Sequence, residues 1–136
     1  MAYVLKAPVA DPQAGRFAFP ACKTMYGGRR VAVGDIVYLF ASETRGGAGL
    51  IARGVVTATA PTPRLQGVER QTPRVDVELR ITGRVVRRLG RAELKPFADW
   101  DDGQPQTELN FKFYRQATDK LCGVSDACAA FLDGFF

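Results

Sequence analysis

The sequence predicts an α+β fold, in which a small β-barrel or strongly bent sheet of five or six strands carries flanking helices, one of them C-terminal. Two observations predict it. Runs rich in β-branched and aromatic residues recur between glycine- and proline-containing segments of the 136-residue chain, and one capped helical pattern ends it. The several amphipathic helices of a doubly wound parallel sheet are missing. We expect a single domain, residues 1–136, because one hydrophobic core serves this length well.

The first expected strand is the apolar run "AYVLKAP", which stops at Pro8. Residues 11–34 then break the apolar period with repeated proline and glycine, and they predict a long connection with one helical turn at most. Long loops in compact domains tend to be functional, so residues 15–28 are expected to line a site. Within them, one of the rings of Phe17 and Phe19 is expected to pack inward and the other to face a cavity.

The clearest local pattern is an antiparallel hairpin of residues 36–41 and 50–58, joined by a glycine-rich turn. Both runs are apolar at successive positions, which indicates strands covered on two faces. A second loop over residues 60–73 follows. Residues 74–82 then alternate between apolar and polar side chains, the pattern of a half-exposed strand.

The last third of the chain is predicted to contain an aromatic strand, "LNFKFY", at residues 109–114. Trp100, in the acidic turn before it, is expected to anchor the core. The polar residues after the strand allow two interpretations: a solvated turn, or an edge that meets a flat polar ligand. The final segment predicts a helix that Ser125 caps and that ends near Gly134.

The charge balance favours polyanions. Nineteen Lys and Arg face fourteen Asp and Glu, a net charge of +5. Five of the cations crowd residues 84–95, either as solvated charges or as a phosphate-contacting patch. Residues 99–102 reverse the sign with three aspartates, and their place in a turn favours solvent exposure.

The absence of histidine removes the commonest general base and metal ligand, so most hydrolase mechanisms are disfavoured and no metal or cofactor is expected. Glycines 46, 47 and 49 lack the Gly-Lys-Ser/Thr ending of a phosphate loop. Cys22 stands beside Lys23, whose charge would lower the pKa of the thiol, but no base completes a nucleophile. An odd count of three cysteines and no apolar membrane-length run predict a reduced, cytoplasmic protein without a membrane span.

Four stretches carry a family resemblance: "YVLKAP", "VGDIVYLFAS" with "GLIARGVV", "VDVELRI" and "FKFYRQATD" before a terminal helix. In this order the chain resembles the EVE domains of the PUA-like superfamily, relatives of the YTH domains that read methylated adenine in RNA. The resemblance implies a partly open barrel and a pocket for a modified base. Val4 and Pro20 stand roughly where EVE sequences often carry tryptophan or asparagine.

The residues that the resemblance assigns come from four parts of the chain. The base pocket would be lined by Lys6, Ala7, Phe19, Pro20, Ala21, Cys22, Lys23, Phe40, Ala41 and Ser42. A phosphate or base edge would be contacted by Arg115, Gln116 and Thr118.

The function expected is therefore that of a non-enzymatic module that binds DNA or RNA carrying a modified base. One alternative is a small enzyme acting on a nucleotide-like metabolite in the same cavity, with Cys22, Lys23 or the aspartates of residues 99–102 doing chemistry. Another is an accessory domain that binds protein, which an open apolar patch would favour.

Overall fold

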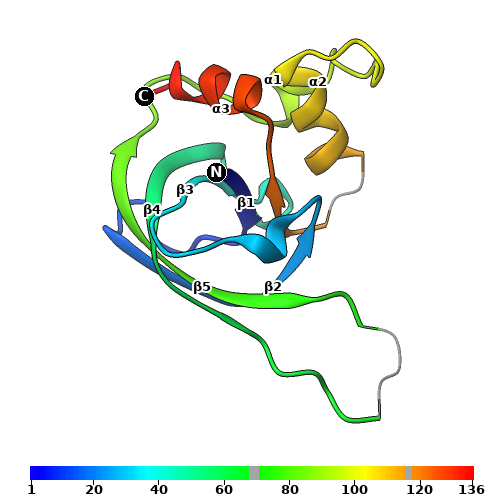
Figure 1. Cartoon of the computed structure of the whole chain (residues 1–136). Helices are drawn as coiled ribbons and strands as arrows, with labels where there is room; N and C mark the ends of the chain where they lie inside the picture. Colours follow the sequence, from blue (N-terminus) through cyan, green and yellow to red (C-terminus); the bar gives the residue numbers. More distant parts are fainter. Residues whose placement is uncertain (68–70, 116–117) are drawn as a thin grey trace.

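In the computed structural model, which describes residues 1–67, 71–115 and 118–136, strands from along the whole chain close into a barrel (Figure 1). Around the ring the order is β1-β3-β4-β5-β2-β6. The strands are β1 (Ala2–Ala7), β2 (Arg16–Met25), β3 (Ile36–Ala41), β4 (Gly49–Pro61), β5 (Arg74–Arg84) and β6 (Lys120–Gly123). The predicted small barrel is confirmed, and its ring of strand pairings is closed rather than partly open.

The helical segments gather mainly over one side of the barrel, where Figure 1 shows α1, α2 and α3 above the strands. They are η1 (Gly28–Arg30), η2 (Glu43–Arg45), α1 (Arg91–Leu94), α2 (Pro105–Leu109), η3 (Asn110–Tyr114) and α3 (Asp126–Asp133). The predicted C-terminal helix is confirmed, because α3 starts after Ser125, whose Oγ accepts a hydrogen bond from the Cys128 amide at 3.1 Å. None of the helices in the described ranges is long and apolar enough to cross a membrane.

Strand alternation divides the apolar side chains into two cores. In β3, Val37 and Leu39 point into the barrel, while Tyr38 and Phe40 pack outside it beneath the helices. This explains why the hairpin strands are apolar at successive positions, as the sequence predicted. The outer core also contains Leu109 and residues of α3.

The connection predicted over residues 11–34 is wrong for its middle part, which forms β2. This strand pairs with β5, and the register shifts between Phe19 and Cys22. The bulge accommodates Pro20, which has no amide to donate to a ladder. Proline and glycine punctuation therefore concealed a strand whose Phe17 and Phe19 alternate with exposed residues.

The strand predicted over residues 109–114 is also wrong, because the segment is helical. Pro105 occupies the first turn of α2, where a missing amide proton is tolerated, and the chain continues through the π-helical turn η3. Leu109 and Phe113 lie four residues apart on one buried face. The real strand is β6, which begins after this segment and which the sequence pattern did not reveal.

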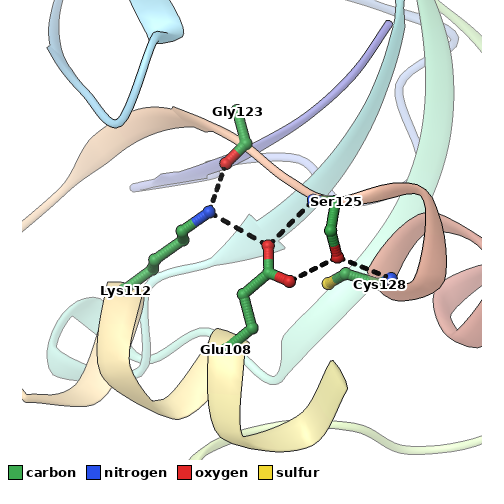
Figure 2. A network of polar contacts seen from close by, with 5 residues as sticks. All are labelled: Glu108, Lys112, Gly123, Ser125 and Cys128. Carbon is green, nitrogen blue, oxygen red and sulfur yellow. Dashed lines mark hydrogen bonds and ion pairs between the residues drawn. The ribbon is translucent and has the colours of Figure 1, made fainter. Parts of the chain in front are cut away.

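One polar network holds this helical segment to the barrel (Figure 2). The Glu108 carboxylate accepts hydrogen bonds from the amide of Ser125, at 2.9 Å, and from its hydroxyl. Lys112 Nζ donates to Glu108 Oε2 at 3.0 Å and to the Gly123 carbonyl at 2.7 Å. The network thus joins α2, η3, the end of β6 and the start of α3.

We expect Glu108→Gln to lower the free energy of unfolding by about 1–2 kcal/mol, because solvent still reaches the carboxylate and tempers its charged hydrogen bonds. Denaturant unfolding at pH 7 measures it. The exposed Glu78→Gln is the matched control and should change little.

The same variant has a predictable pH dependence. Burial would raise the pKa of Glu108, but the hydrogen bonds from Ser125 and Lys112 outweigh burial and hold that pKa below its ordinary value. The stabilisation is therefore complete above the unfolded-state pKa, about 4.3, and is lost as the pH falls through the folded-state pKa. A stability difference between wild type and Glu108→Gln that stayed constant down to low pH would contradict this network.

Candidate functional site

A cavity of about 550 Å³ opens where the end of β1, the loop after it, β2 and the start of β6 meet. This volume lies within the range typical of small-ligand sites. It is lined by Leu5, Lys6, Ala7, Pro8, Val9, Ala10, Asp11, Ala14, Arg16, Phe17, Ala18, Phe19, Pro20, Ala21, Cys22, Lys23, Arg74, Asp119 and Lys120.

The apolar wall of the cavity is continuous with the core inside the barrel. Leu5 belongs to that core, and Phe17 and Phe19 are half-buried against it. The two rings are stacked, with centroids 5.6 Å apart and planes inclined by only 13°. They share one face of β2 because they are two residues apart. Stacked aromatic rings of this kind can extend their stack to another planar ring.

The β2 bulge shapes the next part of the wall. Ala21 has a positive φ of 52°, a conformation that non-glycine residues rarely adopt. Its amide donates to Asp76 Oδ1 at 2.8 Å, and its carbonyl accepts from Arg74 Nη1 at 2.8 Å. Hydrogen bonds from the Ala21 amide and from Thr62 lower the pKa of Asp76. β5 and the segment before it therefore hold the bulge in place.

Charged groups form the rest of the lining: Lys6, Arg16, Lys23, Arg74 and Lys120 against Asp11 and Asp119. Lys6 is 1% exposed, and its Nζ donates to the Phe113 carbonyl at 3.3 Å and lies 5.0 Å from the centre of the Tyr114 ring. Burial lowers the pKa of Lys6, an effect that the nearby Asp119 and Glu43 carboxylates oppose.

The structure brings together one part of the predicted pocket. Lys6, Ala7 and residues 19–23 line the cavity, whereas Phe40, Ala41 and Ser42 do not. All three are buried; Phe40 packs against Phe113 at 5.1 Å between centroids, and Ser42 Oγ lies 3.0 Å from Thr44 Oγ1. Because Leu39 points into the barrel, its neighbour Phe40 points toward the helices instead.

The predicted edge residues lie elsewhere. The Arg115 guanidinium lies over the rings of Trp100 and Phe111, at 5.2 and 5.0 Å from their centres. Neither Arg115 nor the half-buried Thr118 lines the cavity, and Gln116 lies outside the described residues. Trp100 is 47% exposed and donates from Nε1 to Asn110, so its prediction as a core anchor is wrong.

Asp119 and Lys120 lie in the polar run after residue 114, but neither of them, nor Arg74, is assigned to the pocket from the sequence; all three line the cavity. Lys120 follows a segment that was predicted to be a strand end, so its place in a short closing strand was hidden. Arg74 was seen only as the exposed start of an alternating strand. The short apolar "KLC" at residues 120–122 is too brief a pattern to indicate a strand without its partners.

The cationic run at residues 84–95 has mainly structural partners. Arg84 donates to the carbonyls of Pro12, Gln13 and Ala14, which fixes the loop beside the cavity. Arg87 donates to the Gly134 carbonyl. Arg84 therefore stabilises the loop beside the cavity, and Arg87 stabilises the C-terminal end of the chain.

The prediction that the pKa of the Cys22 thiol is lowered is wrong. Burial raises its pKa to about 11; Asp76 adds to the rise and Arg74 opposes it. Cys122 and Cys128 are buried, and burial raises the pKa of each to about 12. Across the described ranges, no group of three or more histidine, cysteine, aspartate or glutamate side chains is placed to hold a metal ion.

A closed, mixed barrel with helices over one side and a C-terminal helix defines an α+β fold. No protein-family model matches the chain, and no curated protein matches it in sequence. Solved structures do match its fold.

The DUF55 domain of human thymocyte nuclear protein 1 is similar over 97% of this chain and 96% of its own, with 11% identity and a TM-score of 0.65. Human THYN1 in complex with DNA containing 5-methylcytosine is similar over 96% and 94%, with 13% identity and a TM-score of 0.64. A protein from Pseudomonas putida matches over 99% of both chains, with 16% identity and a TM-score of 0.62. The fold that the EVE resemblance implied is thus confirmed.

We expect iodoacetamide to alkylate Cys22 at pH 7.5 more slowly than a free cysteine, by roughly tenfold or more, because little thiolate is present. Peptide mass spectrometry across a pH series measures the rate, and Cys22→Ser identifies the labelled site. The rate should climb toward pH 11; a plateau already reached near pH 9 would contradict the raised pKa.

Proposed function

We propose that the chain is a nucleic-acid-binding module that holds a modified base in the cavity between β1, the following loop and β2. The observation that carries the proposal is a cavity of about 550 Å³ whose lining combines two stacked aromatic rings, Phe17 and Phe19, with cationic side chains. The cationic side chains are Lys6, Arg16, Lys23, Arg74 and Lys120. The similar structure of human THYN1 holds DNA containing 5-methylcytosine, which supports a modified cytosine as the first ligand to test.

The energetics require both features of the site. A base stacked on an aromatic side chain gains roughly 1–3 kcal/mol. Unstacking a base from a duplex costs a few kcal/mol, so the two terms nearly cancel. Stacking alone would leave weak binding. Phosphate contacts from the cationic side chains of the lining supply the remaining binding free energy, and the net charge of +5 favours the encounter with nucleic acid.

The proposal includes no chemical step on the base. The sequence has no histidine, and the Cys22 thiol in the cavity lining has a pKa of about 11, which keeps it protonated at neutral pH. Binding and discrimination are therefore the functions that these side chains suit best. The hairpin residues Phe40, Ala41 and Ser42 are left out of the proposed pocket because they are buried away from it.

Fluorescence anisotropy with labelled oligonucleotides tests the proposal. Phe19→Ala should weaken binding of a 5-methylcytosine oligonucleotide by roughly 5-fold to 150-fold, the equivalent of losing ~1–3 kcal/mol of stacking. Val86→Ala, at an exposed apolar residue outside the cavity, is the control. Titrations at two salt concentrations, with methylated and unmethylated strands, separate base reading from charge. Binding that ignores both methylation and Phe19 would sink the proposal.

A further inference from the structure

Three lysines form a row across adjacent strands at the edge of the cavity. Lys6 of β1 is the direct cross-strand partner of Lys120 of β6, and on the other side of β6 the residue after Lys23 pairs with Leu121. Neighbouring strands lie about 4.8 Å apart, so the three side chains leave the sheet close together. Leu5 and Leu121 point into the barrel, which directs Lys6 and Lys120 away from its interior.

Lys120 is the unusual member of this row. It is 3% exposed, yet its ammonium makes no hydrogen bond or ion pair with any residue in the described parts of the chain. Lys6 has one carbonyl acceptor, that of Phe113, and the face of Tyr114. The Lys120 Nζ is not one of the fully buried polar atoms, so it keeps contact with solvent and is open to an added acceptor. Both lysines belong to the residues that line the cavity.

The electrostatics agree with the geometry. Burial lowers the pKa of Lys120; the neighbouring Cys122 opposes this change, and the positive charges of Lys6 and Lys23 lower the pKa further. Asp119 and Asp11 are the acidic residues of the cavity lining, and neither forms an ion pair with a lysine among the residues described. The Asp119 and Glu43 carboxylates act on Lys6 from a distance, but among the described residues no carboxylate of the lining is paired with a lysine of the row, so an added anion would displace none.

We propose that Lys6, Lys23 and Lys120 form a binding site for a phosphate group at the edge of the cavity. This inference rests on the proposed function, and the phosphate is that of the nucleic-acid backbone next to the base in the cavity. Ammonium groups only donate hydrogen bonds, and a phosphate has the several acceptor oxygens that such a row can share. A terminal or free phosphate has the same chemistry, so the experiment must distinguish these sources.

The variant to test is Lys120→Met, which keeps the length of the side chain and removes its charge. Lys95→Met is the matched control, since Lys95 is exposed and outside the cavity. Binding is measured by anisotropy on a 5-methylcytosine oligonucleotide with a native backbone, and on versions with one uncharged methylphosphonate linkage at each position near the modified base.

For the native backbone, Lys120→Met should weaken binding about tenfold and reduce the slope of log affinity against log salt by about 1. On the oligonucleotide whose neutral linkage removes the bound phosphate, wild type and Lys120→Met should bind alike. Lys95→Met should behave as wild type on that linkage series. Equal native-backbone binding by wild type and Lys120→Met, or no sensitivity of wild type to any neutral linkage, would overturn the site.

Thermal unfolding provides an arm that does not depend on base reading. Without ligand, Lys120→Met should melt at or above the wild-type temperature, because it removes a poorly solvated charge that Lys6 and Lys23 repel; a fall of several degrees would mean a structural partner and would overturn the proposal. Inorganic phosphate, compared with chloride of equal ionic strength, should raise the melting temperature of wild type only if the site accepts free phosphate. Without such a rise, the linkage series assigns the backbone as the source.

Failure of the proposed function is distinguishable from failure of this site. Loss of the preference for methylated cytosine, with the Lys120 and linkage effects intact, removes base reading and leaves the phosphate site. If wild type binds no oligonucleotide, the inorganic phosphate arm decides: stabilisation of wild type that Lys120→Met lacks supports the site, and equal melting with and without phosphate overturns it.

Discussion

The four residues of β6 are the constraint on which both the barrel and its cavity depend. β6 pairs antiparallel with β1 and parallel with β2, and these two short pairings close the ring. The chain approaches so closely there that a Cβ on Gly28 would lie 2.1 Å from the Leu121 carbonyl oxygen, and one on Gly123 would lie 2.7 Å from that of Tyr26. Only glycine fits such contacts. The Lys112 ammonium on the Gly123 carbonyl then ties the closure to the helices.

The brevity of this closure also creates the site. On the β2 side, pairing with β6 is limited to Thr24 and Met25, so the preceding residues of β2 are paired only with β5. The end of β1 and the first part of β2 therefore face each other without a strand between them, and the cavity occupies that space. The bulge at Ala21 lies in the same unpaired stretch, which explains why a strained backbone conformation occurs beside the cavity.

The predictions that succeeded rest on patterns that local sequence determines. Alternation identified the strand at residues 74–82, successive apolar positions identified the hairpin, and Ser125 identified the start of the last helix. The failures have long-range causes. A proline inside β2 is tolerated because a distant Asp76 and Arg74 hold the bulge, and the aromatic residues after Asn110 are helical because Phe113 packs on Phe40. Of the cavity lining, the residues on β1 and β2 are among those that the family resemblance names; Lys120 is not, because its short strand is defined mainly by the partners that it closes against.

The outer faces of β1 and β6 change from apolar to cationic side chains along their length. Val4 and Cys122 are cross-strand partners on the outer face of the barrel, and they pack in the core between the barrel and the helices. Two residues nearer the cavity, the same face carries the next pair, Lys6 and Lys120. Burial is nearly complete at all four positions, so solvent exposure does not explain the lysines. An apolar side chain at position 120 would extend the outer core at no electrostatic cost. Lys6 is held by the Phe113 carbonyl and the face of Tyr114, whereas Lys120 has no acceptor among the described residues and is repelled by Lys6. The anionic ligand proposed above would supply that missing acceptor.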